Sequence, residues 1–286
     1  MNSAIETMLS KYHVNNNKER ENAIKEIIQE IVLSGLSRGG FFDKAVFYGG
    51  TCLRIFHHLD RFSEDLDFAL INNDGDFAID HYFPAVKKEL LSYGLEMEVS
   101  KKEKSQGNND ILSAFVKGNT QTLMLTLFPN ADLKDVINNQ VIKIKFEIDV
   151  DNPAGGIVES KYSLLPAPYM VKVFDETTLF AGKIHAIICR DYKNRVKGRD
   201  YYDYLFYCAR NTKINLEYLE NKLKNSNKIS KETKIDLKAV KDLLKEKFMN
   251  LDYELAKSDV YNFIDNPHSL DIWGKDLFLS TLDGLH

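Results

Sequence analysis

The chain has 286 residues, of which 44% are hydrophobic, and its formal net charge is −4. This length is sufficient for one large domain or for two of ordinary size, each with a hydrophobic core. The negative net charge excludes a protein that attracts polyanions over its whole surface. A nucleic-acid partner would therefore need local basic patches.

Cysteine usage and hydropathy both favour the cytoplasm. The three cysteines are isolated and show no CxxC spacing, which argues against a disulfide framework or a zinc site. The first twenty residues are polar and charged and lack the apolar core of a signal peptide. No apolar run approaches the ~18 residues that span a bilayer. We therefore expect a soluble cytoplasmic protein with no membrane partner.

The first half of the chain mixes helical spacing with strand alternation. In chain order, these patterns predict a helix over 17–36, a strand over 45–48, a short helix over 51–59, a strand over 65–71, a helix over 77–93, and strands over 95–99, 111–117, 121–128 and 141–150. Turns rich in Gly and Asn separate the later strands, which indicates that they extend the sheet in antiparallel fashion.

A segment rich in Gly and Pro, predicted as a loop over 153–168, is the best candidate for a domain boundary. After it the predicted elements are helices over 175–189, 198–210, 216–225 and 231–248, then short helices with Trp273 in the core. The sequence thus predicts an α+β protein with one domain over 1–155 and a mainly helical domain over 156–286.

Two carboxylates and a glycine turn carry the strongest chemical signal. Asp65 and Asp67 lie one residue apart on a predicted strand and so share a face. Crowded carboxylates repel unless a cation neutralises them, and Mg²⁺ suits such a pair together with substrate phosphates. The turn Gly49-Gly50, followed by Thr51, lies just upstream, where a triphosphate could meet the backbone. The segment therefore predicts a metal-dependent nucleotidyl-transfer site.

This order of strand, Gly-Gly turn, short helix and carboxylate pair resembles the polymerase-β-like nucleotidyltransferase fold with its mixed sheet. The resemblance implies that Asp65 and Asp67 hold two Mg²⁺ ions and that a third carboxylate comes from a neighbouring strand. Glu147 and Asp149 share a face of the strand predicted over 141–150, so either can be that ligand. Glu147 is favoured because its Ile-Lys-Phe-Glu-Ile context is similar to the corresponding strand of the relatives.

Four motifs give a closer resemblance. They read GGTCLR at 49–54, RFSEDLDF at 61–68, KIHA at 183–186 and KGRDYYD at 197–203. Together they resemble the AbiEii toxins, which are nucleotidyltransferase-like proteins of bacterial type IV toxin–antitoxin and abortive-infection systems. The resemblance covers roughly positions 20 to 210.

The AbiEii resemblance also implies roles for individual residues. Backbone N–H groups and a hydroxyl at a helix N-terminus would approach the nucleotide phosphates, and a serine would line the same pocket: these are Gly49, Gly50, Thr51 and Ser63. Lys183 would neutralise phosphate charge. Asp200 or Asp203 would act near the acceptor or would position Lys183 and Arg199. In this interpretation the helical domain contributes to the active site.

The implied activity is transfer of a nucleoside monophosphate from an NTP to RNA, notably to the tRNA 3′ acceptor end. Such a reaction would block translation and growth, and a cognate antitoxin is the expected partner. Two alternatives stay open. One keeps the enzyme but gives it a small-molecule acceptor, as in antibiotic nucleotidyltransferases, or a protein acceptor. The other is a non-catalytic module that binds a nucleotide or a partner, although the intact carboxylates argue against it.

Several polar features have a plainer explanation beside the functional one. Basic residues interleaved with tyrosines suit an RNA backbone with stacked bases, but they equally suit a solvated helix end: Arg190, Tyr192, Lys193, Arg195, Lys197, Arg199, Tyr201 and Tyr202. Arg199, Asp200 and Asp203 can also be ion pairs on a helix surface. His185 is expected to pack between helices. The lysine-rich stretch 222–247 is expected to be a solvated helical face.

Overall fold

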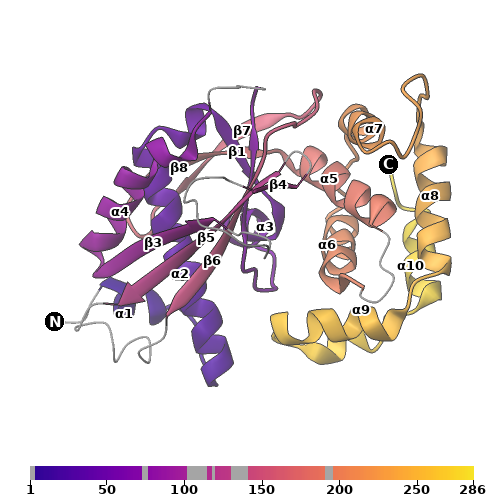
Figure 1. Ribbon diagram of the computed structural model, residues 1–286. Helices are drawn as coiled ribbons and strands as arrows, with labels where there is room; N and C mark the ends of the chain where they lie inside the picture. Colours follow the sequence, from indigo (N-terminus) through magenta and orange to yellow (C-terminus); the bar gives the residue numbers. More distant parts are fainter. Residues whose placement is uncertain (1–3, 73–76, 102–114, 118–119, 130–140, 191–195) are drawn as a thin grey trace, which may run out of the picture. The chain divides into compact units, whose positions relative to one another are not determined.

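The computed structural model describes residues 4–72, 77–101, 115–117, 120–129, 141–190 and 196–286, which form two compact units (Figure 1). The first unit comprises Met1–His57, Phe62–Asn152 and Ser160–Val173, and the second comprises His58–Arg61, Pro153–Glu159 and Phe174–His286. In the described ranges, no helix has the length and apolar character needed to cross a membrane. None of the three cysteines forms a disulfide.

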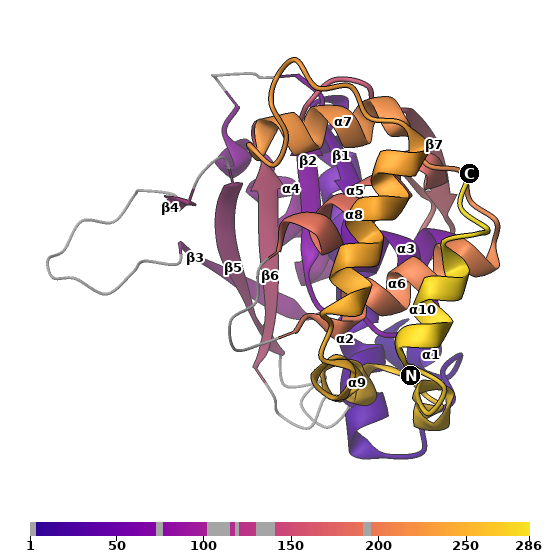
Figure 2. The same ribbon diagram turned by 90° about the vertical axis from the view of Figure 1, so that its right-hand side faces the viewer.

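A mixed sheet forms the centre of the first unit. Its strands are β1 (Ala45–Tyr48), β2 (Leu66–Leu70), β3 (Leu95–Lys101), β4 (Phe115–Lys117), β5 (Thr120–Pro129), β6 (Ile142–Asp149), β7 (Val158–Ser163) and β8 (Tyr169–Phe174). Their order is β3-β5-β6-β2-β1-β8-β7, and β4 pairs with β5. Figure 2 shows β3, β5 and β6 side by side. The pairs β2–β6 and β1–β8 are parallel, whereas β1–β2, β3–β5 and β5–β6 are antiparallel.

The helices of the first unit are α1 (Ala4–Leu9), α2 (Asn17–Arg38), α3 (Gly49–His57) and α4 (Phe83–Ser92), with 3₁₀ turns at Phe41–Asp43 and Ile79–His81. The long helix α2 starts at a cap in which the Asn16 side chain accepts the N–H of Glu19. Its Ser34 hydroxyl donates to Glu89 of α4 at 2.8 Å, and Arg38 pairs with the same carboxylate at 3.0 Å. These contacts fix α4 against α2.

Four buried phenylalanines form the core beneath the central strands. Phe68 of β2 stacks on Phe146 of β6 with ring centroids 4.6 Å apart. Phe41 meets Phe68 edge-on at 4.9 Å, and Phe47 lies 5.1 Å from it. Burying such a ring contributes about 1.5–3 kcal/mol. Because strand side chains alternate between faces, this packing directs the residues between the phenylalanines to the opposite face.

The second unit is helical. Its helices are α5 (Glu176–Cys189), α6 (Gly198–Ala209), α7 (Leu216–Asn225), α8 (Leu237–Met249), α9 (Tyr253–Val260) and α10 (Lys275–Thr281), with 3₁₀ turns at Tyr261–Phe263 and Pro267–Leu270. Asp or Asn side chains cap α5, α7, α8 and α9 by accepting a backbone N–H of the first turn. The core is aromatic, with Phe180, Tyr204, Tyr207, Phe248 and Phe278 fully buried. Trp273 lies in this core as expected.

Most predicted elements are confirmed, often to within one or two residues. The strand over 45–48 and the helix over 216–225 agree with β1 and α7 at both ends. The antiparallel extension of the sheet is also confirmed. Of the strand predicted over 111–117, only β4 falls within the described residues.

Three predictions need correction. The segment 153–168 is not only a loop, because it contains β7, and β8 follows it without having been predicted. The helix over 77–93 begins at Phe83, because Pro84 has no N–H to bond the carbonyl of residue 80 in an earlier turn. The helix over 231–248 begins at Leu237 after its cap Asp236, since the N–H of Ile235 bonds Glu220 at 2.9 Å instead.

Two carboxylates of α2 are buried in the first unit. Glu26 accepts Arg54 Nε at 2.8 Å and the Tyr12 hydroxyl at 3.1 Å. Glu30 accepts the Ser163 hydroxyl at 3.1 Å. Burial raises the pKa of Glu30 to about 7; the charge of Glu26 adds to this rise, and the hydrogen bond from Ser163 reduces it.

Glu30 should make stability depend on pH. Between pH 4.5 and about 7 the folded protein keeps a proton on Glu30 that the unfolded chain has released. The free energy of unfolding therefore falls as the pH rises through this window, by on the order of 3 kcal/mol. Glu30→Gln removes this contribution. Urea unfolding of both proteins at several pH values should show the wild type losing stability relative to the variant, and parallel pH profiles would contradict the assignment.

Candidate active site

The turn after β1 brings the backbone of Gly49 against Asp67. Tyr48 pairs with Asp67 across the antiparallel strands, and the chain then enters α3 at Gly49 with φ +81°. A Cβ atom on Gly49 would lie 2.2 Å from Oδ2 of Asp67, so only glycine fits. The N-terminus of a helix carries backbone N–H groups and a partial positive charge, and this one lies beside a carboxylate.

Thr51 connects the first turn of α3 to the start of β2. Its side chain is fully buried, and Oγ1 donates a hydrogen bond of 2.5 Å to the backbone carbonyl of Asp65. The Thr51 hydroxyl therefore donates its proton to a protein carbonyl and has none left to donate to a phosphate. A phosphate contact by Thr51 is limited to its backbone N–H. Ser63 is half-buried, and its carbonyl accepts Gln29 Nε2 at 3.2 Å.

An acidic face runs along β2 and β6. Leu66 and Phe68 are buried, and the alternating Asp65 and Asp67 are half-buried, as the sequence predicted. In the parallel pairing, Asp67 stands opposite Glu147. The structure therefore brings a carboxylate of β6 level with one of β2.

Strand register separates the two candidates for the third carboxylate. Asp149 stands opposite Ala69, about 6.6 Å farther along the strand than Glu147. Its Oδ1 accepts the N–H of Asp151 at 3.1 Å in the turn after β6. Glu147 instead pairs with Lys145 at 2.6 Å and accepts the Thr122 hydroxyl at 3.3 Å. Register favours Glu147.

The donor set fits a hard cation. Asp67 and Glu147 offer carboxylate oxygens on one face, and oxygen is the donor that Mg²⁺ prefers. Within the described ranges, however, no three His, Cys, Asp or Glu side chains converge on one point where they could hold a metal. Binding by Asp65, Asp67 and a third carboxylate together would thus require some adjustment of their side chains.

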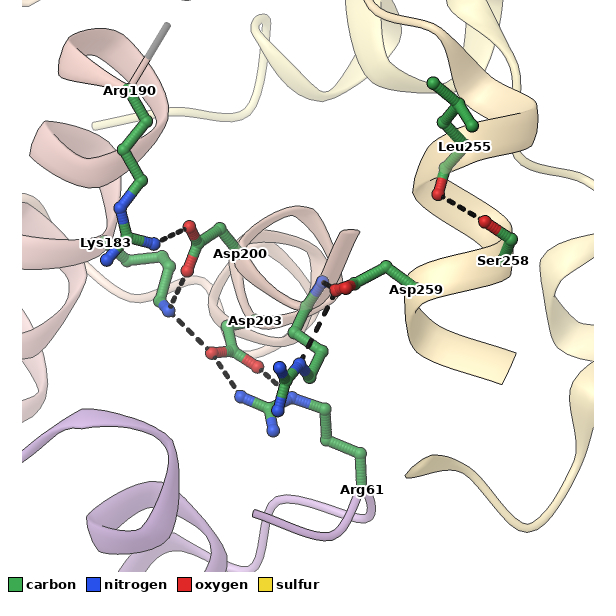
Figure 3. Close-up of polar contacts among 9 residues, drawn as sticks. Arg61, Lys183, Arg190, Asp200, Asp203, Leu255, Ser258 and Asp259 are labelled. Atoms are coloured by element: carbon green, nitrogen blue, oxygen red, sulfur yellow. Dashed lines mark hydrogen bonds and ion pairs between the residues drawn. The ribbon is translucent and has the colours of Figure 1, made fainter. Parts of the chain in front are cut away.

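The second unit contains a network of buried charges, drawn in Figure 3. Lys183 of α5 lies 2.8 Å from Asp200 and 2.8 Å from Asp203, both on α6. Arg61 donates two parallel hydrogen bonds to Asp203, Nε to Oδ1 at 2.6 Å and Nη2 to Oδ2 at 2.7 Å. Arg190 pairs with the second oxygen of Asp200.

The network keeps Arg61, Asp200, Asp203 and Lys183 charged although they are buried or nearly so, whereas Arg190 is 41% exposed. The side chains of Arg61 and Asp203 are 3% and 0% exposed. Burial alone would raise the pKa of Asp203, but the charges of Arg61 and Lys183 outweigh it and lower the pKa. Lys183 and Arg190 likewise lower the pKa of Asp200 against the effect of burial. Burial acts to lower the pKa of Lys183, yet the two carboxylates raise it. The three cations Arg61, Lys183 and Arg190 and the two carboxylates Asp200 and Asp203 give this network a net charge of +1.

No role was predicted for Arg61 from the sequence, and Arg190 had a role only as a member of the basic cluster that suits an RNA backbone or a solvated helix end. Arg61 begins the motif at 61–68, which was the available signal, but its partner Asp203 lies 142 positions away. Sequence spacing cannot identify such a pair. The pairing of Lys183 with Asp200 and Asp203 agrees with one of the two roles that the resemblance implied for these aspartates.

The remaining basic and aromatic candidates mostly pack within the second unit. Arg199 lies over the Phe263 ring at 4.1 Å and near Asp259 at 3.5 Å. Tyr201 is buried, so stacking on a base is excluded, and the Tyr202 hydroxyl donates to Asp60 at 2.8 Å. Helix packing of His185 is confirmed by its contact with Ser226 at 3.1 Å. Tyr192, Lys193 and Arg195 lie outside the described residues.

Comparisons with known proteins identify a family and two solved structures of similar fold. Residues 31–275 match the family described as "Nucleotidyl transferase AbiEii toxin, Type IV TA system". The chain is similar to MenT4, a nucleotidyltransferase toxin of Mycobacterium tuberculosis H37Rv, with a TM-score of 0.61 and 15% identity over 99% of this chain and 89% of that one. It is also similar to JHP933 from Helicobacter pylori, with a TM-score of 0.50 and 16% identity over 91% and 88%. At these identities both structures support the fold. No curated protein matches the sequence.

Gly49→Ala should disrupt the acidic face. The new Cβ would meet Asp67 Oδ2 in a left-handed backbone conformation that costs roughly 1–2 kcal/mol by itself. We expect a lower free energy of unfolding in urea and loss of the thermal shift expected when Mg²⁺ and NTP are added to the wild type. Gly182→Ala is the control, because an added Cβ there meets nothing within 4 Å. Equal thermal shifts in the two variants would show that the close approach is unimportant.

Proposed function

This chain belongs to the AbiEii family of nucleotidyltransferase toxins, and from that premise we propose that it transfers a nucleoside monophosphate from an NTP to RNA with Mg²⁺ as cofactor. The proposed acceptor is the tRNA 3′ end, so that the reaction blocks translation and growth. The observation that carries the proposal is the acidic face, where Asp67 and Glu147 stand level beside the glycine turn. A type IV system also implies a cognate antitoxin as partner.

Each group of the acidic face has a proposed task. Asp65, Asp67 and Glu147 would hold the metal, which neutralises phosphate charge when it is bound. Backbone N–H groups of Gly49 and Gly50 at the start of α3 bind the triphosphate. The acceptor hydroxyl attacks the α-phosphorus, pyrophosphate leaves, and a carboxylate of this face takes the hydroxyl proton. Catalysis then consists mainly of positioning and charge neutralisation.

Lys183 is proposed to neutralise phosphate charge on the nucleotide. Two of its three ammonium N–H groups point to Asp200 and Asp203, and no third acceptor contacts it among the described residues. Its side chain is 14% exposed, so one donor is left for a ligand. The division into domains over 1–155 and 156–286, with the second contributing to the active site, remains a prediction, as does a more direct role of Asp200 or Asp203 near the acceptor.

Local charge is compatible with RNA as the acceptor. Between positions 222 and 247 the chain has nine lysines against four carboxylates, a net charge of +5, whereas the whole chain sums to −4. The rest of the protein therefore sums to −9. Such a basic segment suits a phosphate backbone and equally suits the solvated face expected from the sequence, and two of its lysines, Lys224 and Lys234, pair with Glu220. Small-molecule or protein acceptors and a non-catalytic binding module remain the alternatives.

The acceptor can be tested with labelled nucleotides. The purified protein is incubated with Mg²⁺ and each α-labelled NTP in turn, with total RNA, protein and small-molecule pools supplied separately. We expect label in RNA of tRNA size, lost on treatment that removes the 3′ end. Asp67→Asn should abolish transfer without unfolding the protein.

Other outcomes of this assay have defined meanings. Label that enters only protein or small molecules would exclude RNA as the acceptor. NTP binding without transfer to any pool would favour the non-catalytic module. Transfer by a folded Asp67→Asn protein at the wild-type rate would refute the assignment of the acidic face.

The third carboxylate can be tested separately. Because Glu147 stands level with Asp67 and Asp149 does not, Glu147→Gln should lower kcat by about 10²-fold or more, and Asp149→Asn by less than about tenfold. Initial rates at saturating NTP compare the two, and melting temperatures verify folding. The reverse order of effects would assign the role to Asp149.

A further inference from the structure

Arg61 makes a buried contact with Asp203 in the second unit, yet the proposed reaction gives it no direct task. Its planar guanidinium forms a two-bond fork with the Asp203 carboxylate, and both side chains are buried. Paired hydrogen bonds of this kind fix the orientation of a carboxylate as well as its position. Arg61 therefore determines how Asp203 lies within the second unit.

Asp203 transmits this orientation to Lys183. Its Oδ2 accepts Nη2 of Arg61 at 2.7 Å and also lies 2.8 Å from Nζ of Lys183. One oxygen atom is thus shared by the two cations. The other ammonium contact, with Asp200, cannot alone set the direction of the remaining N–H of Lys183, because one bond leaves rotation free. The fork of Arg61 thereby orients the donor that is left for a ligand.

Arg61 also sets the charge that a ligand of Lys183 would meet. With Arg61 present, three cations face two carboxylates and the network has a net charge of +1. Without it, Lys183 and Arg190 face Asp200 and Asp203, and the sum is zero. In the described part of the chain, Lys183 is then the cation that contacts buried Asp203. The positive charge of Lys183 is therefore compensated by this aspartate and is not available to a ligand. An anionic ligand would lose attraction although Lys183 itself is intact.

We propose that Arg61 is a positioning residue for nucleotide binding, which acts through Asp203 to orient Lys183 and to keep the network cationic toward the triphosphate. This inference rests on the proposed role of Lys183 as the phosphate-neutralising group. Arg61 itself touches no phosphate in this mechanism. The rival explanation is that Arg61 only braces α6 and the segment 58–61.

A double-mutant cycle separates these explanations. The full-length wild type, Arg61→Met, Lys183→Met and the double variant are titrated with Mg²⁺ and NTP in the absence of any acceptor. We expect Arg61→Met to weaken NTP binding by about tenfold or more, the effect of one lost charge-assisted interaction. In the Lys183→Met background the same change should weaken binding by less than about twofold, because the residue through which Arg61 acts is gone.

Two further variants control for folding. Arg61→Lys keeps the charge but loses the fork, so we expect binding between that of the wild type and Arg61→Met; it replaces Arg61→Met in the cycle if that protein does not fold. Arg210→Met removes another forked arginine, whose partner Glu176 does not contact Lys183. It should bind NTP as the wild type does.

The double-mutant cycle decides between a positioning role of Arg61 and a purely structural one. Equal losses from Arg61→Met with and without Lys183 would overturn the inference and leave Arg61 as a structural brace. Unchanged NTP binding in a folded Arg61→Met protein would overturn it as well. Because the titration contains no acceptor, its result stands even if RNA proves to be the wrong acceptor, and the labelled-nucleotide assay decides that question alone.

Discussion

The parallel pairing of β2 with β6 is the constraint on which the candidate site depends. Phe68 and Phe146 stack in the core at 4.6 Å, and this contact fixes which residues of the two strands stand opposite each other. A slip by one residue would turn every side chain of β2 to the other face and place the aspartates in the core. Burying an unpaired carboxylate is so costly that the slipped register is excluded. Aromatic packing on one face of the sheet thus determines where the acidic side chains lie on the other face.

Carboxylates that are buried or half-buried have different surroundings in the two units. On the acidic face of the first unit, Asp65 and Asp67 retain partial exposure, as a group must if it is to bind a ligand from solution. In the second unit, Asp203 is completely buried and is matched by Arg61 and Lys183. Breaking such a buried pair is strongly destabilising, whereas its net contribution to stability is small. Its value therefore lies in holding Lys183 charged and in place.

How much of the structure could be predicted from the sequence depended on how far apart in the sequence the interacting residues lie. β6 was predictable because its buried side chains alternate with exposed or half-buried ones. β1 and β2 were predictable as short runs that are mostly apolar, since most of their residues are buried. β7 gave no such signal, since its side chains are exposed or half-exposed on both faces. The pair of Asp65 and Asp67 could be predicted from their spacing alone. The choice between Glu147 and Asp149 needed strand register, and the pairing of Arg61 with Asp203 needed the tertiary fold.

The path of the chain through residues 58–61 has a consequence for how this protein can evolve. These residues lie between α3 and β2 in sequence, yet they belong to the second unit, where Arg61 neutralises Asp203. A single genetic exchange near position 155 could give the helical half a new N-terminal partner whose sequence lacks this arginine. The recombinant would inherit a buried aspartate with one of its two cations missing. The helical unit therefore depends on a residue that is encoded before position 155, and an N-terminal replacement must supply an arginine at this place.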